Sequence, residues 1–333
     1  MTEEKSVFVP TDPETLKALN EFNNILLPKD YGFFDLGDMS RRGRLIKHMK
    51  EVKKGYHLPF SSLYNEFLIA KNELTLLSGY TGFGKTELVN QIMLDCINQG
   101  AKGAIISLEL TPEELEKRLY EQSLGSTMID EKREDAFHFH YEGKLKLWDG
   151  KKLSKANELI KIMEIFYLEL NHTVFVLDNM MMLGARPDDY NKQYETVDAI
   201  KNFCKSYPVS VFLVAHPKKP KENNFINIKD PKEYCFDVPN IYDVSGSATI
   251  VNLVDNYLGL GANTLKYHVL KEIKENRLDR RDCENILRHG DVMLKRDKRR
   301  EHGTLFNKEL FFDVNFRRFK ESEFDKLKPY VEV

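Results

Sequence analysis

The sequence is poor in cysteine, and its four cysteines lie far apart in the chain. None of them forms a C-x-x-C pair, which argues against a zinc ribbon, and a chain of 333 residues does not need a disulfide scaffold. We therefore expect buried, inert thiols in a reducing compartment. The cysteines are Cys96, Cys204, Cys235 and Cys283.

Net charge and long hydrophobic runs are also lacking. A formal net charge of −2 gives no general attraction for nucleic acid, so any such contact has to come from local patches. No apolar run approaches the roughly 18 residues of a membrane-spanning helix. The first ten residues, MTEEKSVFVP, are acidic and lack the apolar core of a targeting peptide. These absences predict a cytoplasmic protein without a membrane partner.

Hydrophobic residues nevertheless make up 41% of the chain, which is enough for a sizeable core. From about residue 72, short apolar runs alternate with helical segments, and this alternation predicts an α/β fold with helices flanking a mostly parallel, twisted sheet. Thr111-Pro112-Glu113-Glu114 is a strong helix start, with threonine as N-cap, proline at the first helical position and acids in the first turn. The expected strands are 73–78, 103–110, 144–149, 172–178 and 209–216, and the expected helices are 84–100, 154–169 and 191–206.

We divide the chain into a short N-terminal arm or linker, 1–55, and a main domain, 56–333. The basic stretch 40–55 is either a solvated helix face or an arm that packs on a neighbouring subunit. The polar stretch 217–240 is predicted as a long loop, and loops of this length are usually functional or mobile. The end of the chain is predicted as a charged helical insertion, 262–290, and closing strands within 291–319.

One segment fits the phosphate-binding pattern G-x-x-x-x-G-K-[ST] in full, between a predicted strand and a predicted helix. Its glycines would let successive backbone N–H groups surround phosphate oxygens. Lys85 would reach the β- and γ-phosphates of ATP, and the Thr86 hydroxyl would bind Mg²⁺. A chance glycine-rich turn is the alternative. The predicted nucleotide contacts are Gly79, Tyr80, Thr81, Gly82, Phe83, Gly84, Lys85, Thr86, Glu87 and Asp178.

Such a site also needs an acid for the metal and a group that activates water. Asp178 ends the apolar run HTVFVLD and is expected as the second Mg²⁺ ligand, unless it only caps a turn. Glu109 is the candidate general base, because we expect the strand before it to neighbour the strand of the phosphate loop; the alternative is a surface acid. His216 ends the run VSVFLVA and could sense the γ-phosphate, or could be a hydrogen-bonded histidine at a strand end.

Five short motifs, in order along the chain, resemble those of the hexameric replicative helicases of the DnaB type, especially the Twinkle and phage primase–helicase branch. The motifs are the phosphate loop GYTGFGKT, Ser107-Leu108-Glu109, VFVLDN ending at Asp178 and Asn179, Ala215-His216-Pro217-Lys218-Lys219, and Asp243-Val244-Ser245-Gly246-Ser247-Ala248 with Asp255 downstream. The resemblance covers about 55–320 and implies a RecA-like P-loop NTPase core with Glu109 as its catalytic glutamate. No primase-like module precedes the motifs, so we expect no priming activity.

Lys298-Arg299-Arg300, near the end of the chain, is similar to the Lys-x-Arg element of the same family. The resemblance implies that Lys298 and Arg300 reach the nucleotide of the neighbouring subunit, with Arg300 as the arginine finger. An arginine supplied in trans would stabilise the charge on the γ-phosphoryl oxygens in the transition state. Arg296 and Arg299 compete for this role, and the whole run KRDKRR could instead be a solvated strand edge.

The resemblance further implies a homo-oligomeric ring, most simply a hexamer, that moves 5′ to 3′ along single-stranded DNA in replication. A primase or a polymerase would be its partner, and the host cytoplasm its location if a phage encodes it. Loops at about 184–192 and 217–247 would line the DNA channel, and the lysines of the second loop would bind phosphates or merely keep the loop soluble. These lysines are Lys218, Lys219, Lys221, Lys229 and Lys232.

Two other functions fit parts of the same pattern. A RecA- or RadA-like recombination ATPase would share the core fold and the phosphate loop, but it would form a helical filament. A regulatory or loader ATPase would bind partner proteins without translocating, and the modest net charge suits that class too. The Lys-x-Arg and His-Pro-Lys elements favour the helicase.

Overall fold

The computed structural model describes residues 55–149, 156–179, 190–217, 236–244, 248–300 and 303–333. These segments belong to one compact unit, 54–333. The expected arm, 1–55, lies outside the described residues except for Gly55, so it remains a prediction.

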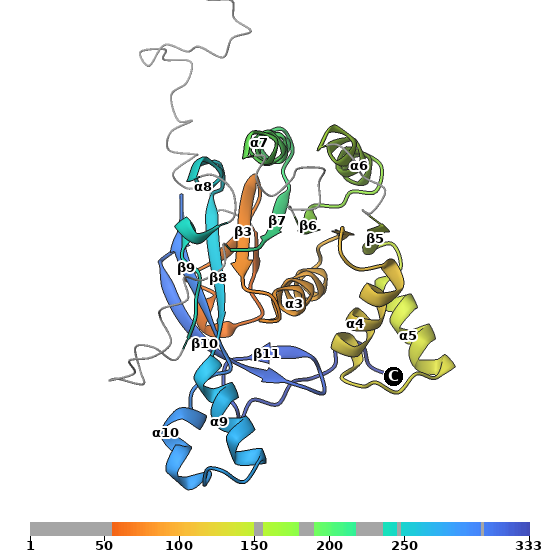
Figure 1. The fold of residues 1–333 in the computed structure, drawn as a ribbon. Helices are drawn as coiled ribbons and strands as arrows, with labels where there is room; N and C mark the ends of the chain where they lie inside the picture. Colours follow the sequence, from red (N-terminus) through yellow and green to blue (C-terminus); the bar gives the residue numbers. More distant parts are fainter. Residues whose placement is uncertain (1–54, 150–155, 180–189, 218–235, 245–247, 301–302) are drawn as a thin grey trace, which may run out of the picture. The chain divides into compact units, whose positions relative to one another are not determined.

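A nine-stranded sheet forms the centre of this unit, in the order β11-β10-β9-β8-β3-β7-β6-β4-β5 (Figure 1). The six strands from β8 to β5 are parallel, and β9, β10 and β11 extend the sheet as antiparallel strands. A separate antiparallel pair joins β1 and β2. The strands are β1 (Gly55–His57), β2 (Leu68–Ala70), β3 (Glu73–Gly79), β4 (Gly103–Ser107), β5 (Leu145–Asp149), β6 (Val174–Asp178), β7 (Ser210–Ala215), β8 (Asn256–Ala262), β9 (Val292–Lys298), β10 (Phe306–Asp313) and β11 (Arg318–Lys320).

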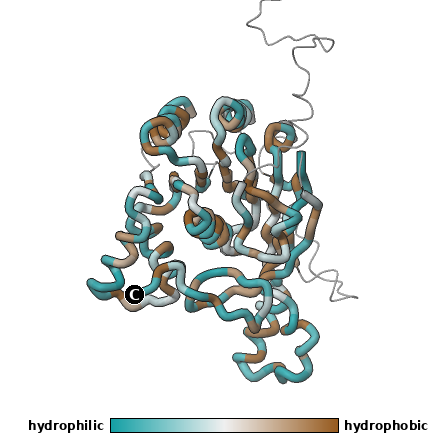
Figure 2. The backbone as a smooth tube through the Cα atoms, turned by 180° about the vertical axis from the view of Figure 1, so that it is seen from behind, coloured by the Kyte–Doolittle hydropathy of each residue, from teal (hydrophilic) through white to brown (hydrophobic). Residues whose placement is uncertain are grey.

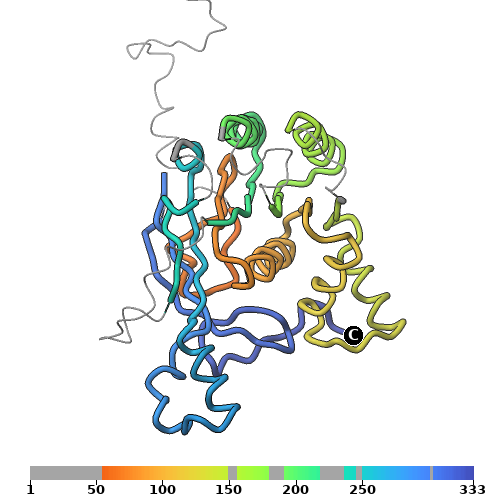
Figure 3. The backbone as a smooth tube through the Cα atoms, viewed as in Figure 1, coloured from red at the N-terminus to blue at the C-terminus, as the bar shows by residue number. Residues whose placement is uncertain are grey.

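Helices cover both faces of the sheet: α3, α4 and α5 lie on one side, and α6, α7 and α8 on the other (Figures 1 and 3). The segment with α9 and α10 connects β8 to β9 beyond the end of the sheet. The helices are α3 (Lys85–Asn98), α4 (Pro112–Leu124), α5 (Glu131–Tyr141), α6 (Ala156–Leu168), α7 (Tyr190–Ser206), α8 (Ala248–Leu253), α9 (Thr264–Lys274) and α10 (Glu284–Leu287), with short 3-10 turns at Ser61–Leu63, Ile241–Asp243 and Arg281–Cys283. Among the described residues, no helix combines the length and apolar character that a membrane crossing requires.

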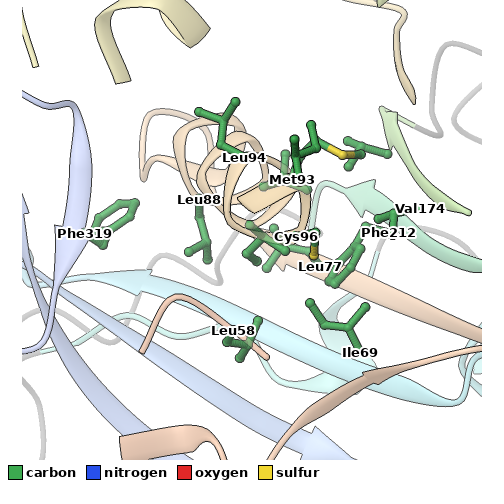
Figure 4. Close-up of a cluster of buried hydrophobic side chains, with 14 of the residues drawn as sticks. Leu58, Ile69, Leu77, Leu88, Met93, Leu94, Cys96, Val174, Phe212 and Phe319 are labelled. Carbon is green, nitrogen blue, oxygen red and sulfur yellow. The ribbon is translucent and has the colours of Figure 1, made fainter. Parts of the chain in front are cut away.

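The central strands are continuous apolar runs because they are buried on both faces. Side chains of β6 alternate between two core clusters: Val174 and Val176 pack toward α3, whereas Phe175 and Leu177 pack toward α7. Figure 4 shows part of the first cluster, with Leu77 among its labelled residues, and Figure 2 shows hydrophobic residues gathered along the strands and α3.

The predicted α/β class and the mostly parallel sheet are confirmed, and the helix start at Thr111 has both bonds of a capping box. Cys96, Cys204 and Cys283 are buried and free, as expected, and Cys235 lies outside the described residues. Within the predicted helical insertion 262–290, the structure has α9, α10 and the 3-10 turn at Arg281–Cys283.

One prediction about strand order is wrong. The strand before Glu109, β4, does not neighbour the phosphate-loop strand β3, because β7 and β6 lie between them. The chain crosses from β3 to β4 and later returns to fill the gap, so sequence neighbours are not sheet neighbours here. The strand expected at 103–110 also ends earlier, at Ser107.

Candidate functional site

The phosphate loop connects the carboxyl end of β3 to the amino end of α3. Gly82 and Gly84 both have φ of 85°, in the left-handed region that favours glycine. At Gly79, a Cβ atom would lie 2.7 Å from the carbonyl oxygen of Leu260 on β8. The loop therefore requires glycine at these three positions, and it brings backbone N–H groups to the start of a 14-residue helix.

Lys85 is the first residue of α3, and it is only 7% exposed. Its Nζ donates to the carbonyl oxygen of Tyr80, 3.1 Å away, so the ammonium folds back over the loop. Burial lowers the pKa of Lys85, while Asp178 and Glu109 act in the opposite direction. Phosphate oxygens would offer this half-desolvated ammonium stronger acceptors than a single carbonyl.

Thr86 and Asp178 form the next part of the site. The Thr86 hydroxyl donates to Oδ2 of Asp178 over 2.8 Å, and Asp178 is 4% exposed. Burial raises the pKa of Asp178, Glu109 adds to this effect, and the Thr86 hydrogen bond opposes it. A hydroxyl and a carboxylate oxygen fit Mg²⁺, which prefers oxygen ligands and completes its shell with phosphates and water. These two residues would hold the metal.

Glu109 reaches the same edge of the sheet. The backbone N–H of Leu108 donates to the carbonyl oxygen of Asp178 over 2.6 Å, which bends the chain after β4 back toward β6. Oε1 of Glu109 accepts hydrogen bonds from Nδ2 of Asn179 and from Nε2 of His216, the latter over 3.3 Å. Glu109 thus lies at the edge of the sheet that carries Asp178 and His216, and this bend rather than strand adjacency places it there.

The electrostatics of Glu109 suit a base. The His216 hydrogen bond lowers the pKa of Glu109, burial opposes that effect, and the charges of His216 and Lys85 add to it. The carboxylate is consequently ionised at neutral pH, and 40% of its side chain is exposed to solvent. An ionised, hydrogen-bonded and solvent-accessible carboxylate can accept a proton from water.

Asn179 is a site residue for which the sequence predicted no role of its own. It follows Asp178 directly, is 1% exposed, and donates to the candidate base. The available signal was its position, because a polar residue that follows the acid at a strand end lies at the same carboxyl edge.

The side chain of Glu87 is engaged in ion pairs, so only its backbone N–H remains a predicted nucleotide contact. Its carboxylate is 8% exposed and accepts from Arg118 and Arg317, on the side of α3 away from the loop. Tyr80 and Phe83 of the loop pack edge to face, with ring centroids 5.8 Å apart. The remaining loop residue with a side chain, Thr81, is exposed.

Lys298 and Arg300 lie at the other edge of the sheet. Lys298 ends β9 opposite Tyr257, next to the amino end of β8, whereas the phosphate loop follows the carboxyl end of β3. Arg300 lies 3.3 Å from Asp255 and donates to the carbonyl oxygen of Asn252 over 2.6 Å. Lys298 and Arg300 are therefore separate from the phosphate site of their own chain.

Two further sets of predictions fall mostly on residues that the structure does not describe. The lysines proposed for the second DNA loop fall within 218–235, outside the described residues, as does most of the first DNA loop, 184–192. What precedes and follows the second loop is described: Pro217 forms an isolated bridge with Val244 and Asp237 with Ala262. The described residues after the loop therefore lie beside β8 at Asp237 and beside Pro217 at Val244.

Comparison with known proteins agrees with this geometry. Residues 59–222 match the AAA domain family. A solved structure described as a DnaB-like replicative helicase and its interactions with primase has a TM-score of 0.63 and 14% identity, covering 92% of this chain and 70% of that one. A second solved structure, described as an ATPase domain, has the same TM-score and identity, with 87% of this chain and all of that one covered. No curated protein matches the chain by sequence.

The matched family region contains β3, the phosphate loop, Glu109, Asp178 and His216. Both similar structures are 14% identical to this chain, so the similarity concerns the fold. The resemblance predicted from five motifs is thus confirmed at the level of the fold, which this chain shares with the solved structure described as a DnaB-like replicative helicase.

Proposed function

We propose that this chain is an ATP-driven DNA helicase that works as a ring on single-stranded DNA. The observation that carries the proposal is the convergence of Lys85, Thr86, Asp178, Glu109 and His216 at the carboxyl edge of β3, β4, β6 and β7. Phosphate-binding, metal-binding and base groups gathered in this way suit phosphoryl transfer to water.

Each residue then has a defined task. Lys85 and the loop N–H groups bind the phosphates, while Thr86 and Asp178 bind Mg²⁺, which when present offsets charge on the phosphate oxygens. Glu109 accepts a proton from the attacking water. Asn179 and His216, which both donate to Oε1 of Glu109, fix the direction of that carboxylate.

His216 is suited to connect hydrolysis with DNA. Its ring bonds Glu109, and the next residue, Pro217, is the last described residue before the proposed DNA loop. A change in the bonding of Glu109 when the γ-phosphate leaves would therefore reach that loop within two residues. Lysines on the loop would bind DNA phosphates without regard to base sequence.

Arg300 and Lys298 act on the nucleotide of a neighbouring subunit in this proposal. Their place at the edge opposite the chain's own phosphate loop supports a role in trans. The ring size of six, movement 5′ to 3′, a function in replication, a cytoplasmic site of action and a primase or polymerase partner rest on the resemblance alone. One of the similar structures is itself described with primase.

The test is ATP turnover with and without oligothymidine. We expect DNA to stimulate the wild type and Glu109→Gln to lower turnover about 100-fold or more, as loss of a general base does. Glu113→Gln, an exposed acid on α4 outside the site, is the matched control and should behave as wild type. Arg300→Ala mixed with wild type should reduce activity more steeply than its fraction of the mixture.

ATP turnover that does not change when DNA is added would contradict the proposed helicase function. The partner-binding regulatory or loader ATPase would then be the better explanation of the same phosphate site. DNA-stimulated turnover by helical filaments would instead favour the recombination ATPase, and electron microscopy of the DNA-bound protein separates filaments from rings.

A further inference from the structure

The turn between β10 and β11, together with β11 itself, packs against the first two turns of α3 (Figure 1). Gly84, Glu87 and Gln91 contact residues 317–319 of this turn and strand. Their spacing of three and four places them on one face of the helix. That face is separate from Thr86, which contacts Asp178 on β6.

Glu87 provides the first of these contacts. Its side chain is 8% exposed, and its Oε1 accepts from Nη2 of Arg317 over 2.5 Å. The other end of the same guanidinium, Nη1, donates to Oε2 of Glu121 on α4 over 2.9 Å, where the carboxylate is 7% exposed. The Glu87 hydrogen bond is the main reason why the pKa of Arg317 is raised. One guanidinium thus joins two buried carboxylates from two helices.

The backbone of Arg317 is held as firmly as its side chain. Its φ of 49° lies in the left-handed region, which a residue other than glycine rarely adopts. Nε2 of Gln122 donates to the carbonyl oxygen of Arg317 over 2.9 Å and to Oε2 of Glu87 over 2.9 Å. Gln122 is fully buried, so the position of the turn is tied to Glu87 through the backbone as well.

Phe319 completes the contact. Gln91 accepts from its backbone N–H over 2.7 Å and donates to its carbonyl oxygen over 2.8 Å. The Phe319 ring lies against Gly84, where a Cβ atom would come within 2.9 Å of it. The turn and strand therefore contact the loop itself as well as the helix that follows it.

We propose that Arg317 is a positioning residue for the phosphate loop. Glu87 follows Thr86 directly, so the direction of the last loop N–H groups depends on how the first turn of α3 is held. Asp178 holds that turn on one side, and Arg317 holds it on the other through Glu87. This proposal rests on the nucleotide binding proposed above, and it adds a residue 230 positions from Glu87 in the sequence.

A matched control separates positioning from simple charge neutralisation. Arg118 on α4 bonds the same oxygen of Glu87 over 3.1 Å and is 32% exposed, close to the 34% of Arg317. Of these two arginines, Arg317 alone belongs to the β10–β11 turn and ties Glu87 to it. If the role is positioning, Arg317→Gln and Arg118→Gln must differ, although each removes one positive charge beside Glu87.

The experiment measures the dissociation constant of a fluorescent ADP analogue with Mg²⁺ for the full chain, together with KM and kcat for ATP. We expect Arg317→Gln to raise the dissociation constant and KM about tenfold, because small misplacements of binding groups have effects of this size, with kcat changed less than about threefold. Arg118→Gln should stay within about twofold of wild type. Arg317→Lys should recover only part of the loss, since an ammonium lacks the planar fork that spans two carboxylates.

Equal effects of Arg317→Gln and Arg118→Gln would overturn the proposal, as would full recovery by Arg317→Lys. A loss of affinity that follows only the folded fraction, measured by circular dichroism in the same samples, would overturn it too. If the wild type binds the analogue while DNA has no effect on its ATP turnover, that result would contradict the proposed helicase function but not the positioning role of Arg317. A wild type that does not bind the analogue would remove both.

Discussion

Nε2 of His216 lies 3.3 Å from Oε1 of Glu109, although 107 residues separate the two in the chain. The pair joins the ends of β4 and β7, which are not neighbours in the sheet because β6 lies between them. Asn179, at the end of β6, donates to the same oxygen. Two polar residues, which follow β6 and β7, thus set the direction of one carboxylate that follows β4, and the His216 hydrogen bond also lowers its pKa.

The first prediction concerns this charge state. His216→Ala should raise the pKa of the Glu109 carboxyl, because it removes the hydrogen bond and the charge that lower the pKa while burial, which raises it, remains. Glu109 acts as a base only when ionised, so the acid limb of the kcat profile should move to higher pH in the variant. In the wild type that limb should lie below the usual glutamate range of about 4.3.

A ¹³C titration of the side-chain carboxyl measures this pKa directly, with Glu109→Gln used to assign the signal. Circular dichroism at each pH excludes unfolding as the cause of lost activity. An unchanged Glu109 titration in His216→Ala would contradict the prediction, whatever happens to the rate.

The second prediction concerns the metal. Asp178→Asn should weaken the Mg²⁺-dependent part of ATP affinity on the order of 10- to 100-fold, as disturbance of a metal's ligand set typically does. Binding of ATP in the presence of EDTA should change far less, because Lys85 and the loop N–H groups remain. Calorimetric titrations with and without Mg²⁺ give both numbers, and equal losses in the two conditions would contradict a metal-binding role.

The raised pKa of Asp178 adds a pH dependence with a defined sign. Mg²⁺ requires the ionised carboxylate, so protons compete with the metal as pH falls. Since burial raises the pKa of Asp178, this competition should begin at a higher pH than an ordinary aspartate would show. Mg²⁺-dependent affinity should therefore decline on acidification before Glu109, whose pKa is lowered, takes up its proton.

The third prediction concerns stability and compares two glutamines with the same bonding pattern. Gln91 accepts from the N–H and donates to the carbonyl of Phe319, and Gln99 does the same to His57. Gln91 is 2% exposed, whereas Gln99 is exposed. Gln91→Ala leaves two buried backbone groups unpaired and should lower the free energy of unfolding by about 2–4 kcal/mol, against less than about 1 kcal/mol for Gln99→Ala.

Urea unfolding of both variants beside the wild type provides the measurement. A similar small loss in both would mean that water reaches Phe319 once Gln91 is truncated. The contact between α3 and β11 would then be looser than the hydrogen bonds indicate.

The sequence predicted the strands well, and it placed the phosphate-loop motif between a strand and a helix as the structure does, for a physical reason. A strand buried on both faces must be a continuous apolar run, so VFVLD and VSVFLVA mark β6 and β7 clearly. The order of the strands in the sheet could not be predicted, because an apolar run carries no information about which strand it pairs with. The candidate base was consequently placed at the right edge but for the wrong reason.

The contacts of Arg317 and Phe319 with α3 could not be predicted from the sequence. Arg317 lies in the run NFRRFK, where two arginines read as ordinary surface charge, and its carboxylate partner Glu87 is 230 residues away. Only the packing of β11 on α3 distinguishes Arg317 from Arg318, which instead lies over the rings of Phe316 and Tyr330.

The last prediction assigns the competing arginines near the C-terminus. Arg296 is 3% exposed and donates to the carbonyl oxygens of Glu66 and Thr304 and to Oδ1 of Asn256. Burial lowers its pKa to about 10. A side chain held in this way cannot extend to a neighbouring subunit, so Arg296 serves the fold. Arg296→Ala should lower the free energy of unfolding by about 3 kcal/mol or more, because buried acceptors lose their donor.

Arg300 differs in kind, because its side chain is 45% exposed and its buried partner Asp255 keeps a second cation, Lys201, 2.5 Å away. Arg300→Ala should therefore change the free energy of unfolding by less than about 1 kcal/mol. If Arg300 is the arginine finger, the same variant should nevertheless abolish DNA-stimulated turnover and poison mixed rings, while the adjacent exposed variant Arg299→Ala should do neither. Urea unfolding and turnover of wild-type mixtures, measured for all three variants, separate the two effects. If Arg299→Ala inhibits turnover of the wild-type mixtures and Arg300→Ala does not, Arg299 is the arginine finger. The alignment with the Lys-x-Arg element would then be wrong by one residue.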